Sequence, residues 1–307
     1  MKRLIAVAIA LMLVASGCGT RRGAKVAGPK SGAYGAQGLL VSPSPGASGA
    51  SSSGGSTAAA GTKSTPKTSQ ATSGADPGGV EASQIVADVG GFGARNGRLF
   101  LGSSQYTTIN FEIDSVVGRE PSQAAIDHLV KVTREVAPGK KVTVNGGNVI
   151  AAQGGSYSGE GVRAIGERLR DVRSDKPIAT VWVGYLDGTL KGGGAAGVAV
   201  GGTVCAVFMD TIDELPFPPT TRLGLEKAIL VQEVFHLMGL VNIGYKSPRP
   251  HEDLDHPHHS NNQDSVMFWA LMNRAHIVNF LARGGVPPTT FDADDTADLR
   301  DLAAGNL

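Results

Sequence analysis

The residues best suited to chemistry gather between positions 232 and 259. Glu233 and His236 lie three residues apart in a predicted helix, and Gln232 lies four residues before His236. Residues four apart share one helix face, which is how HExxH helices present two zinc ligands and a general base. Five of the chain's seven histidines fall in this segment; after His236 they are His251, His256, His258 and His259. Such a cluster in a His-poor chain predicts a metal site.

This segment resembles the metzincin metallopeptidases, whose signature is HExxHxxGxxH followed by a methionine turn beneath the metal. Glu233, His236, Gly239 and Met267 match that signature in order. The resemblance covers about residues 220 to 270. It implies a zinc-dependent peptidase in which Glu233 activates water, Gly239 forms a structural turn and Met267 forms the Met-turn.

Within that family the archaemetzincins and related bacterial proteins are the most similar branch. Their third histidine is followed by two cysteines and a methionine at fixed spacing. The run from His259 to Met267 keeps this spacing, with Ser260 and Ser265 at the two cysteine positions. The resemblance thus implies that His236 and His259 are metal ligands.

Three positions depart from the family pattern. Gln232 replaces the first zinc histidine, and Asn242 occupies the usual third-ligand position. His259 lies seventeen residues beyond Asn242. We expect His259 to be the third ligand, delivered by an extended loop, with Asn242 as a loop residue; His256 and His258 are alternatives that the sequence leaves open.

The amide of Gln232 bears directly on activity. Zinc in proteins is held by thiolate, imidazole or carboxylate, and a neutral amide oxygen is a far weaker donor. Losing one of three imidazoles weakens zinc binding and removes the activated water. Glu233 would then be a base with nothing to deprotonate.

Three hypotheses follow. The first is a metzincin-like protein that is catalytically impaired, a pseudoenzyme that binds a peptide or protein. The second is an active zinc metallopeptidase that hydrolyses peptide bonds with an altered metal shell, completed by Gln232 or His256. The third is a structural envelope protein without metal. Metal content separates the first from the second, and the absence of a cleft would favour the third.

The elements that must position these residues are indicated by hydrophobic periodicity. Strands are expected over 107–117, 141–144, 178–185 and 198–209, the last with a bend at Gly201 and Gly202. The polar side chains of the first strand should face solvent. Helices are expected over 121–137, 157–172, 220–239, 270–282 and 292–303, with Thr220 or Thr221 capping the third. Strands alternating with helices predict an α/β (α+β) fold with a twisted, mostly parallel sheet.

The chain begins with an apparent export signal. Lys2 and Arg3 precede the apolar run 4–14, and small residues then lead to Cys18. This arrangement resembles a bacterial lipobox, so 1–17 is predicted to be a signal peptide and Cys18 to carry the lipid that anchors the protein in a membrane of the cell envelope. Gly19, which is not Asp, favours the outer membrane under Gram-negative sorting rules.

Residues 18–85 are predicted to form a disordered tether and 86–307 the folded domain. From Val41 to Val80, 34 of 40 residues are Gly, Ser, Ala, Thr or Pro. Such a segment has too few large apolar side chains to offset the entropy lost when its backbone is ordered.

The formal net charge of +1 argues against a nucleic-acid partner. The second cysteine, Cys205, lies in an apolar run and is predicted to be buried.

Overall fold

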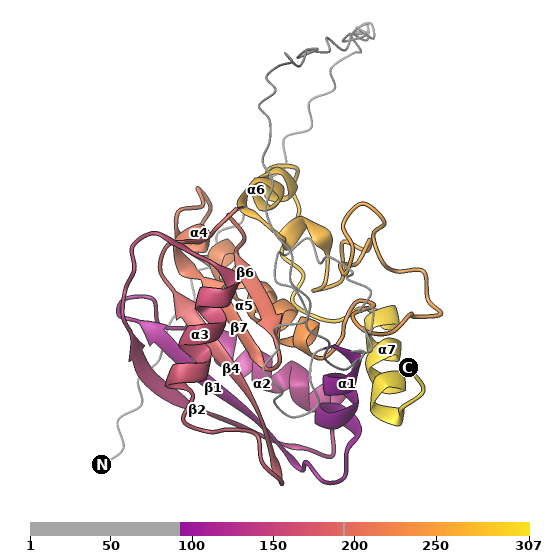
Figure 1. The fold of residues 1–307 in the computed structure, drawn as a ribbon. Helices are drawn as coiled ribbons and strands as arrows, with labels where there is room; N and C mark the ends of the chain where they lie inside the picture. The colour runs from indigo at the N-terminus through magenta and orange to yellow at the C-terminus, as the bar shows by residue number, and fades with distance from the viewer. Residues whose placement is uncertain (1–92, 193) are drawn as a thin grey trace, which may run out of the picture. The chain divides into compact units, whose positions relative to one another are not determined.

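The structure is a computed structural model that describes residues 93–192 and 194–307 (Figure 1). The predicted signal peptide, the lipid site at Cys18, the tether and the first residues of the predicted domain lie outside the described residues. Among the residues that are described, no helix combines the length and the apolar character needed to cross a bilayer.

The core of the fold is a five-stranded sheet in the order β2-β1-β4-β7-β6. The strands are β1 (Thr108–Val116), β2 (Lys141–Ile150), β4 (Ile178–Leu186), β6 (Gly197–Gly201) and β7 (Val204–Phe208). Neighbouring pairs are parallel except β6, which runs antiparallel to β7 at the edge. Two short strands, β3 (Ser156–Tyr157) and β5 (Thr189–Leu190), pair separately. The prediction of a mixed α/β fold with a mostly parallel sheet is confirmed.

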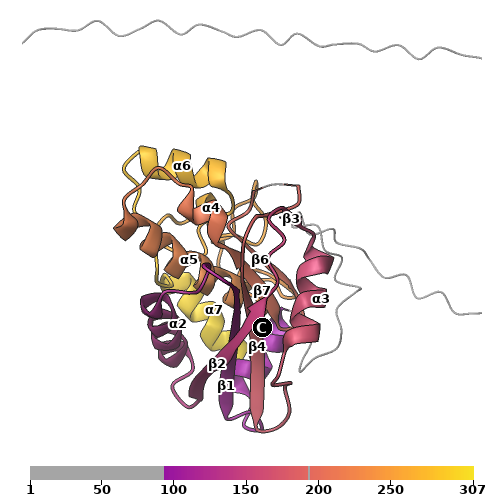
Figure 2. The ribbon, with the colours of Figure 1, turned by 90° about the vertical axis from the view of Figure 1, so that its left-hand side faces the viewer.

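Helices cover both faces of this sheet. Figure 2 shows α3 (Gly159–Leu169) on one side, and α2 (Gln123–Val136) and α5 (Pro219–Leu237) on the other. Each side has its own apolar cluster: Ile109 and Phe111 pack with α2 and α5, whereas Trp182 and Phe208 pack with α3. The remaining helices are α1 (Ala94–Gly97), η2 (Arg98–Gly102), α4 (Met209–Asp213), η3 (Trp269–Leu271), α6 (Arg274–Ala282) and α7 (Ala293–Ala304).

The predicted strand over 198–209 is wrong in one respect. It is a hairpin, because the expected bend at Gly201 and Gly202 is a full reversal of the chain, with φ of 104° and 56° at the two glycines. Both values lie in the left-handed region that glycine adopts without a steric penalty. The reversal places β6 at the edge of the sheet, and Cys205 is buried in β7 as predicted.

The prediction that β1 has a solvent-facing polar side is also wrong. Glu112 and Asp114 are fully buried, and each carboxylate accepts hydrogen bonds from other parts of the domain in place of water. Glu112 accepts from the N–H groups of Asp171 and Val172, and Asp114 accepts from Trp182 Nε1 at 2.7 Å. Alternation of polar and apolar residues cannot separate a solvated face from one whose carboxylates are satisfied internally.

Several boundaries differ from prediction for local reasons. β2 extends to Ile150, because its pairing with β1 continues past a shift in register as far as Ile150, which lies opposite Val116. α5 begins at Pro219 without a side-chain cap, so neither Thr220 nor Thr221 is the N-cap. The helix expected over 270–282 is divided into η3 and α6, because Asn273 caps α6 by accepting from His276 N–H.

Candidate functional site

The site begins where α5 ends. The chain leaves the helix at Gly239, whose φ is 107° and whose N–H donates to the carbonyl of His236 at 3.0 Å. A Cβ at Gly239 would lie 2.7 Å from the backbone nitrogen of Ala94. Glycine is therefore required here both by conformation and by the close approach of the preceding chain.

His236 lies in the last turn of α5 and is only 6% exposed. Its Nδ1 lies 2.7 Å from the carbonyl oxygen of Leu240, so Nδ1–H donates and Nε2 is left as the acceptor. Burial lowers the pKa of His236 well below its ordinary value, and the neighbouring His259 lowers it further. The imidazole is thus held neutral, in the tautomer that can offer Nε2 to an electrophile.

His259 is the loop histidine whose ring contacts His236. The two ring centroids are 4.9 Å apart and the planes cross at 73°. His259 Nδ1 lies 3.0 Å from the carbonyl oxygen of Pro257. The structure therefore brings together the two imidazoles that the sequence places 23 residues apart.

The two alternative ligands lie differently. His256 stacks on Trp269 with centroids 4.2 Å apart and planes within 4°, and its Nδ1 is 2.8 Å from Asp253. His258 has a φ of 67°, and its Nδ1 faces the carbonyl oxygen of Val241 at 3.2 Å. His256 thus belongs to an aromatic cluster beside the Met-turn, whereas His258 is close enough to lower the pKa of His236.

Gln232 points at the Met-turn and is 1% exposed. Its amide nitrogen lies 3.3 Å from the carbonyl oxygen of Val266 and 3.4 Å from that of Phe268, the residues on either side of Met267. Only the NH₂ end of an amide can donate to carbonyl oxygens, so these partners fix its orientation. Gln232 thus joins α5 to the Met-turn.

Met267 lies at the centre of that turn and is fully buried. Its N–H donates to Ser265 Oγ at 2.9 Å, and its carbonyl accepts from Ser260 N–H at 2.7 Å. The two serines that stand at the family's cysteine positions are therefore buried parts of the turn.

Asn242, at the usual third-ligand position, is a brace within the loop. Its Nδ2 donates to Glu252 at 2.6 Å, and its Oδ1 accepts from Ser247 N–H at 2.7 Å. Its φ of 57° is one that asparagine tolerates better than most residues. Both polar ends of the side chain are engaged in shaping the loop that carries the histidines.

Glu233 lies against the edge of the sheet and is 7% exposed. A Cβ at Gly197 of β6 would lie 2.7 Å from Glu233 Oε1 and 2.7 Å from Ile229 Cγ2. The glycine therefore allows the carboxylate to lie directly beside the edge strand. Glu233 and His236 come from successive turns of one helix, which holds them in fixed relation.

The side chains gathered around His236 do not match the three-histidine zinc site of the metzincins. A catalytic zinc ion takes three protein ligands and a water. His236 and His259 supply two imidazoles, but the amides of Gln232 and Asn242 are bonded to backbone and loop. In the described part of the chain, the three His, Asp or Glu side chains whose ligand atoms all lie within 4.8 Å of one another belong to a different group: His251, Asp292 and Asp295.

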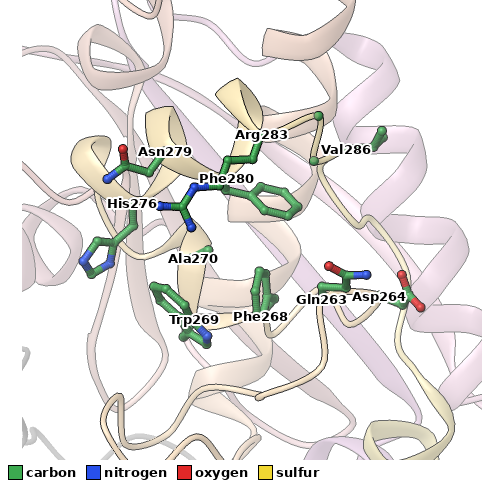
Figure 3. A pocket seen from close by; sticks show the side chains of 12 residues that line it. Gln263, Asp264, Phe268, Trp269, Ala270, His276, Asn279, Phe280, Arg283 and Val286 are labelled. Atoms are coloured by element: carbon green, nitrogen blue, oxygen red, sulfur yellow. The ribbon is translucent and has the colours of Figure 1, made fainter. Parts of the chain in front are cut away.

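A pocket of about 580 Å³ opens beside the Met-turn (Figure 3). Phe268 and Phe280 line it and contact each other edge to face, with ring centroids 5.4 Å apart. Trp269 and His276 border one end, and Gln263 and Asp264 border the other. The sequence analysis identified the Met-turn at Met267, next to this pocket, but not the pocket itself, because the residues of α6 that line it belong to no recognisable motif.

Comparisons with known proteins give one similar solved structure. The crystal structure of archaemetzincin from Methanopyrus kandleri is 15% identical, with a TM-score of 0.44, and the alignment covers 66% of this chain and 97% of that one. No family model matches the chain, and no curated protein matches it.

Proposed function

We propose that the chain is a lipid-anchored protein of the cell envelope whose metzincin-like domain binds a peptide or protein without hydrolysing it. The lipid on Cys18 would hold the domain at the membrane, and the tether would let it reach about 40–50 Å from the surface. The domain would keep the helix, the turn and the cleft region of a metallopeptidase, but not its full metal shell.

The orientation of Gln232 carries this proposal. Its amide nitrogen donates to two carbonyls of the Met-turn, so the side chain at the first-ligand position has a structural task. The amide oxygen that is left is a neutral donor, which zinc accepts poorly. With Asn242 bonded to Glu252 and Ser247, two of the three positions of the family's ligand pattern are occupied by braces.

Two features support binding of an extended chain. β6 is the edge strand of the sheet and pairs only with β7 among the described residues, so its outer side is where a peptide strand could add. The pocket beside the Met-turn is lined by Phe268, Trp269 and Phe280, which suits an apolar or aromatic side chain of that peptide. α5 adjoins both regions, because Glu233 lies beside Gly197 of β6 and Gln232 donates to the carbonyl of Phe268.

An active zinc metallopeptidase is the second candidate. The approach of the His236 and His259 rings to 4.9 Å favours it, because two imidazoles and the carboxylate of Glu233 lie on adjoining elements. In that case Glu233 would act as the base in hydrolysis of a peptide bond. The two candidates differ in metal binding: an active peptidase would bind a metal ion that is lost when His236 is replaced.

Binding and cleavage can be measured on the same material. The full chain in detergent would be mixed with fluorescent decapeptides that each carry one aromatic residue, with and without added zinc. We expect saturable binding and intact peptides, with binding at least tenfold weaker in Phe280→Ala. Val117→Ala, which shortens an apolar side chain that is 72% exposed elsewhere, should bind normally. Zinc-dependent cleavage that disappears in Glu233→Gln would establish the second candidate instead.

A further inference from the structure

A second cluster of polar side chains lies behind the histidine loop, where that loop meets the start of α7. His251 is 2% exposed and Asp295 is fully buried, and the half-buried Asp292 is the N-cap of the helix. One ligand atom from each of the three lies within 4.8 Å of the other two.

Two atoms in this cluster are buried and lack hydrogen bonds. Among the residues that the structure describes, neither His251 Nδ1 nor Asp295 Oδ1 has a hydrogen-bond partner. They face each other at 3.4 Å. Leaving such groups without hydrogen bonds in the interior is unfavourable, so their convergence requires an explanation.

The spacing matches a pair of zinc ligands. Zinc bonds to nitrogen and oxygen at about 2.0–2.1 Å in a tetrahedron, whose edges are then about 3.3–3.4 Å long. The separation of His251 Nδ1 and Asp295 Oδ1 equals that edge. A carboxylate oxygen of Asp292 lies within 4.8 Å of both atoms, so a small shift of this side chain could complete a third corner, and a water could complete the fourth.

The surrounding contacts orient both ligands. His251 Nε2 lies 3.0 Å from Asp298 Oδ2, which fixes the proton on Nε2 and turns the Nδ1 lone pair toward Asp295. Ser265 Oγ donates to Asp295 Oδ2 at 2.5 Å, so Oδ1 is the carboxylate oxygen that faces the imidazole. A carboxylate on the second nitrogen of a ligating histidine and a hydrogen bond on a ligating carboxylate are usual around protein-bound metals.

We propose that His251, Asp292 and Asp295 form a structural zinc site, separate from the His236–His259 pair. The site would join the loop that carries His256, His258 and His259 to α7. Through Ser265 it would also hold the Met-turn in place. This inference does not depend on whether the domain binds or cleaves a peptide.

A proton is the competing occupant of this cluster. Burial lowers the pKa of His251, but Asp295 and Asp298 outweigh it and raise the pKa to about 10. A doubly protonated His251 would satisfy the charges of both carboxylates without a metal. The test must therefore measure metal directly.

The test uses the full chain in detergent, in a His236→Ala background that disables the other histidine pair. The protein is dialysed against micromolar zinc, and bound zinc and the midpoint of thermal unfolding are measured. We expect close to one zinc per chain and a higher midpoint with zinc than with a chelator. Asp292→Asn should bind zinc at least tenfold more weakly while it remains folded, because asparagine keeps the N-cap.

Asp294→Asn is the matched control. It removes the same charge two residues further along, in the first turn of α7, but Asp294 is exposed and outside the cluster. This variant should bind zinc like its parent. His251→Gln should bind none. Absence of zinc in the parent, or equal zinc in the parent and in folded Asp292→Asn, would overturn the proposal.

Discussion

The amide nitrogen of Gln232 lies 3.3 Å from the carbonyl oxygen of Val266, across the interface between α5 and the Met-turn. In the family that the sequence resembles, this position holds a zinc ligand. Here the side chain links α5 to the Met-turn by hydrogen bonds to the carbonyls of Val266 and Phe268.

Removing this amide should destabilise the domain. Gln232→Leu would leave the carbonyl of Val266 buried without its donor, so we expect the free energy of unfolding to fall by about 1–3 kcal/mol. Urea unfolding followed by tryptophan fluorescence measures this. Gln153→Leu, at an exposed glutamine, should change it by less than about 0.5 kcal/mol. Equal stability of Gln232→Leu and the wild type would show that the amide is not a brace.

The turn after His236 should be intolerant of any side chain. Gly239→Ala would combine a positive φ with a Cβ only 2.7 Å from the backbone nitrogen of Ala94. Gly284→Ala is the matched control, because its φ is 88° and nothing lies within 4 Å of the added Cβ. We expect the control to lose about 1–2 kcal/mol for the left-handed conformation. Gly239→Ala should lose about 1–3 kcal/mol more because of the crowding. Comparable unfolding midpoints for the two variants would contradict this account.

Stability should depend on the ionised form of Asp187. Burial alone would raise the pKa of this carboxyl, but hydrogen bonds from the Tyr157 hydroxyl and from the N–H groups of Gly154 and Gln153 hold it below its ordinary value. The folded chain therefore favours the carboxylate. Its contribution is fully present above the unfolded pKa of about 3.9 and is lost as the pH falls through the folded value.

Asp187→Asn should accordingly be less stable than the wild type at pH 7, and the difference should shrink as the pH falls below about 4. Thermal unfolding between pH 3 and pH 7 measures this difference. Asp255→Asn, at an exposed carboxylate, should show little difference at any pH. A gap between wild type and Asp187→Asn that stays constant with pH would mean that the carboxylate charge is not the cause.

The predicted lipid site can be tested by fractionation. In a bacterial host, the full chain should sediment with membranes and dissolve in detergent. Cys18→Ser should be released into the soluble fraction, because the acyl chains that bury CH₂ groups in the bilayer would be missing. Cys205→Ser, at the buried cysteine, should stay with the membranes. Membrane association of Cys18→Ser would rule out lipid at that residue as the anchor.

The strands and helices could be predicted because residues buried on one face of an element recur at regular intervals in the sequence. The apolar run at 178–185 indicates a central strand, and β4 occupies it. The Gly201–Gly202 pair indicates a bend, but not its angle, since the reversal depends on pairing between β6 and β7. The burial of the Glu112 and Asp114 carboxylates could not be predicted, because their hydrogen-bond donors, backbone N–H groups and the Trp182 indole, lie 33 to 68 residues away in the sequence.

For the candidate site, the sequence selects residues by motif but does not give their contacts. Motif spacing identified Glu233, His236 and Met267, and the structure places His259 against His236. The braces made by Gln232 and Asn242 could not be read from sequence, because each depends on a loop conformation. The proximity of His251 to Asp292 could not be predicted either, because it depends on how the loop folds against the start of α7.

The dependence of bound zinc on His236 tests the central claim most directly. Zinc per chain would be measured by elemental analysis after dialysis for the full chain, His236→Ala and Gln232→His. We predict equal zinc in the first two, since any zinc bound at His251 does not involve His236, and additional zinc in Gln232→His, which restores an imidazole. A wild-type chain that loses one zinc on His236→Ala would contradict the account and show that the metal shell is complete despite Gln232.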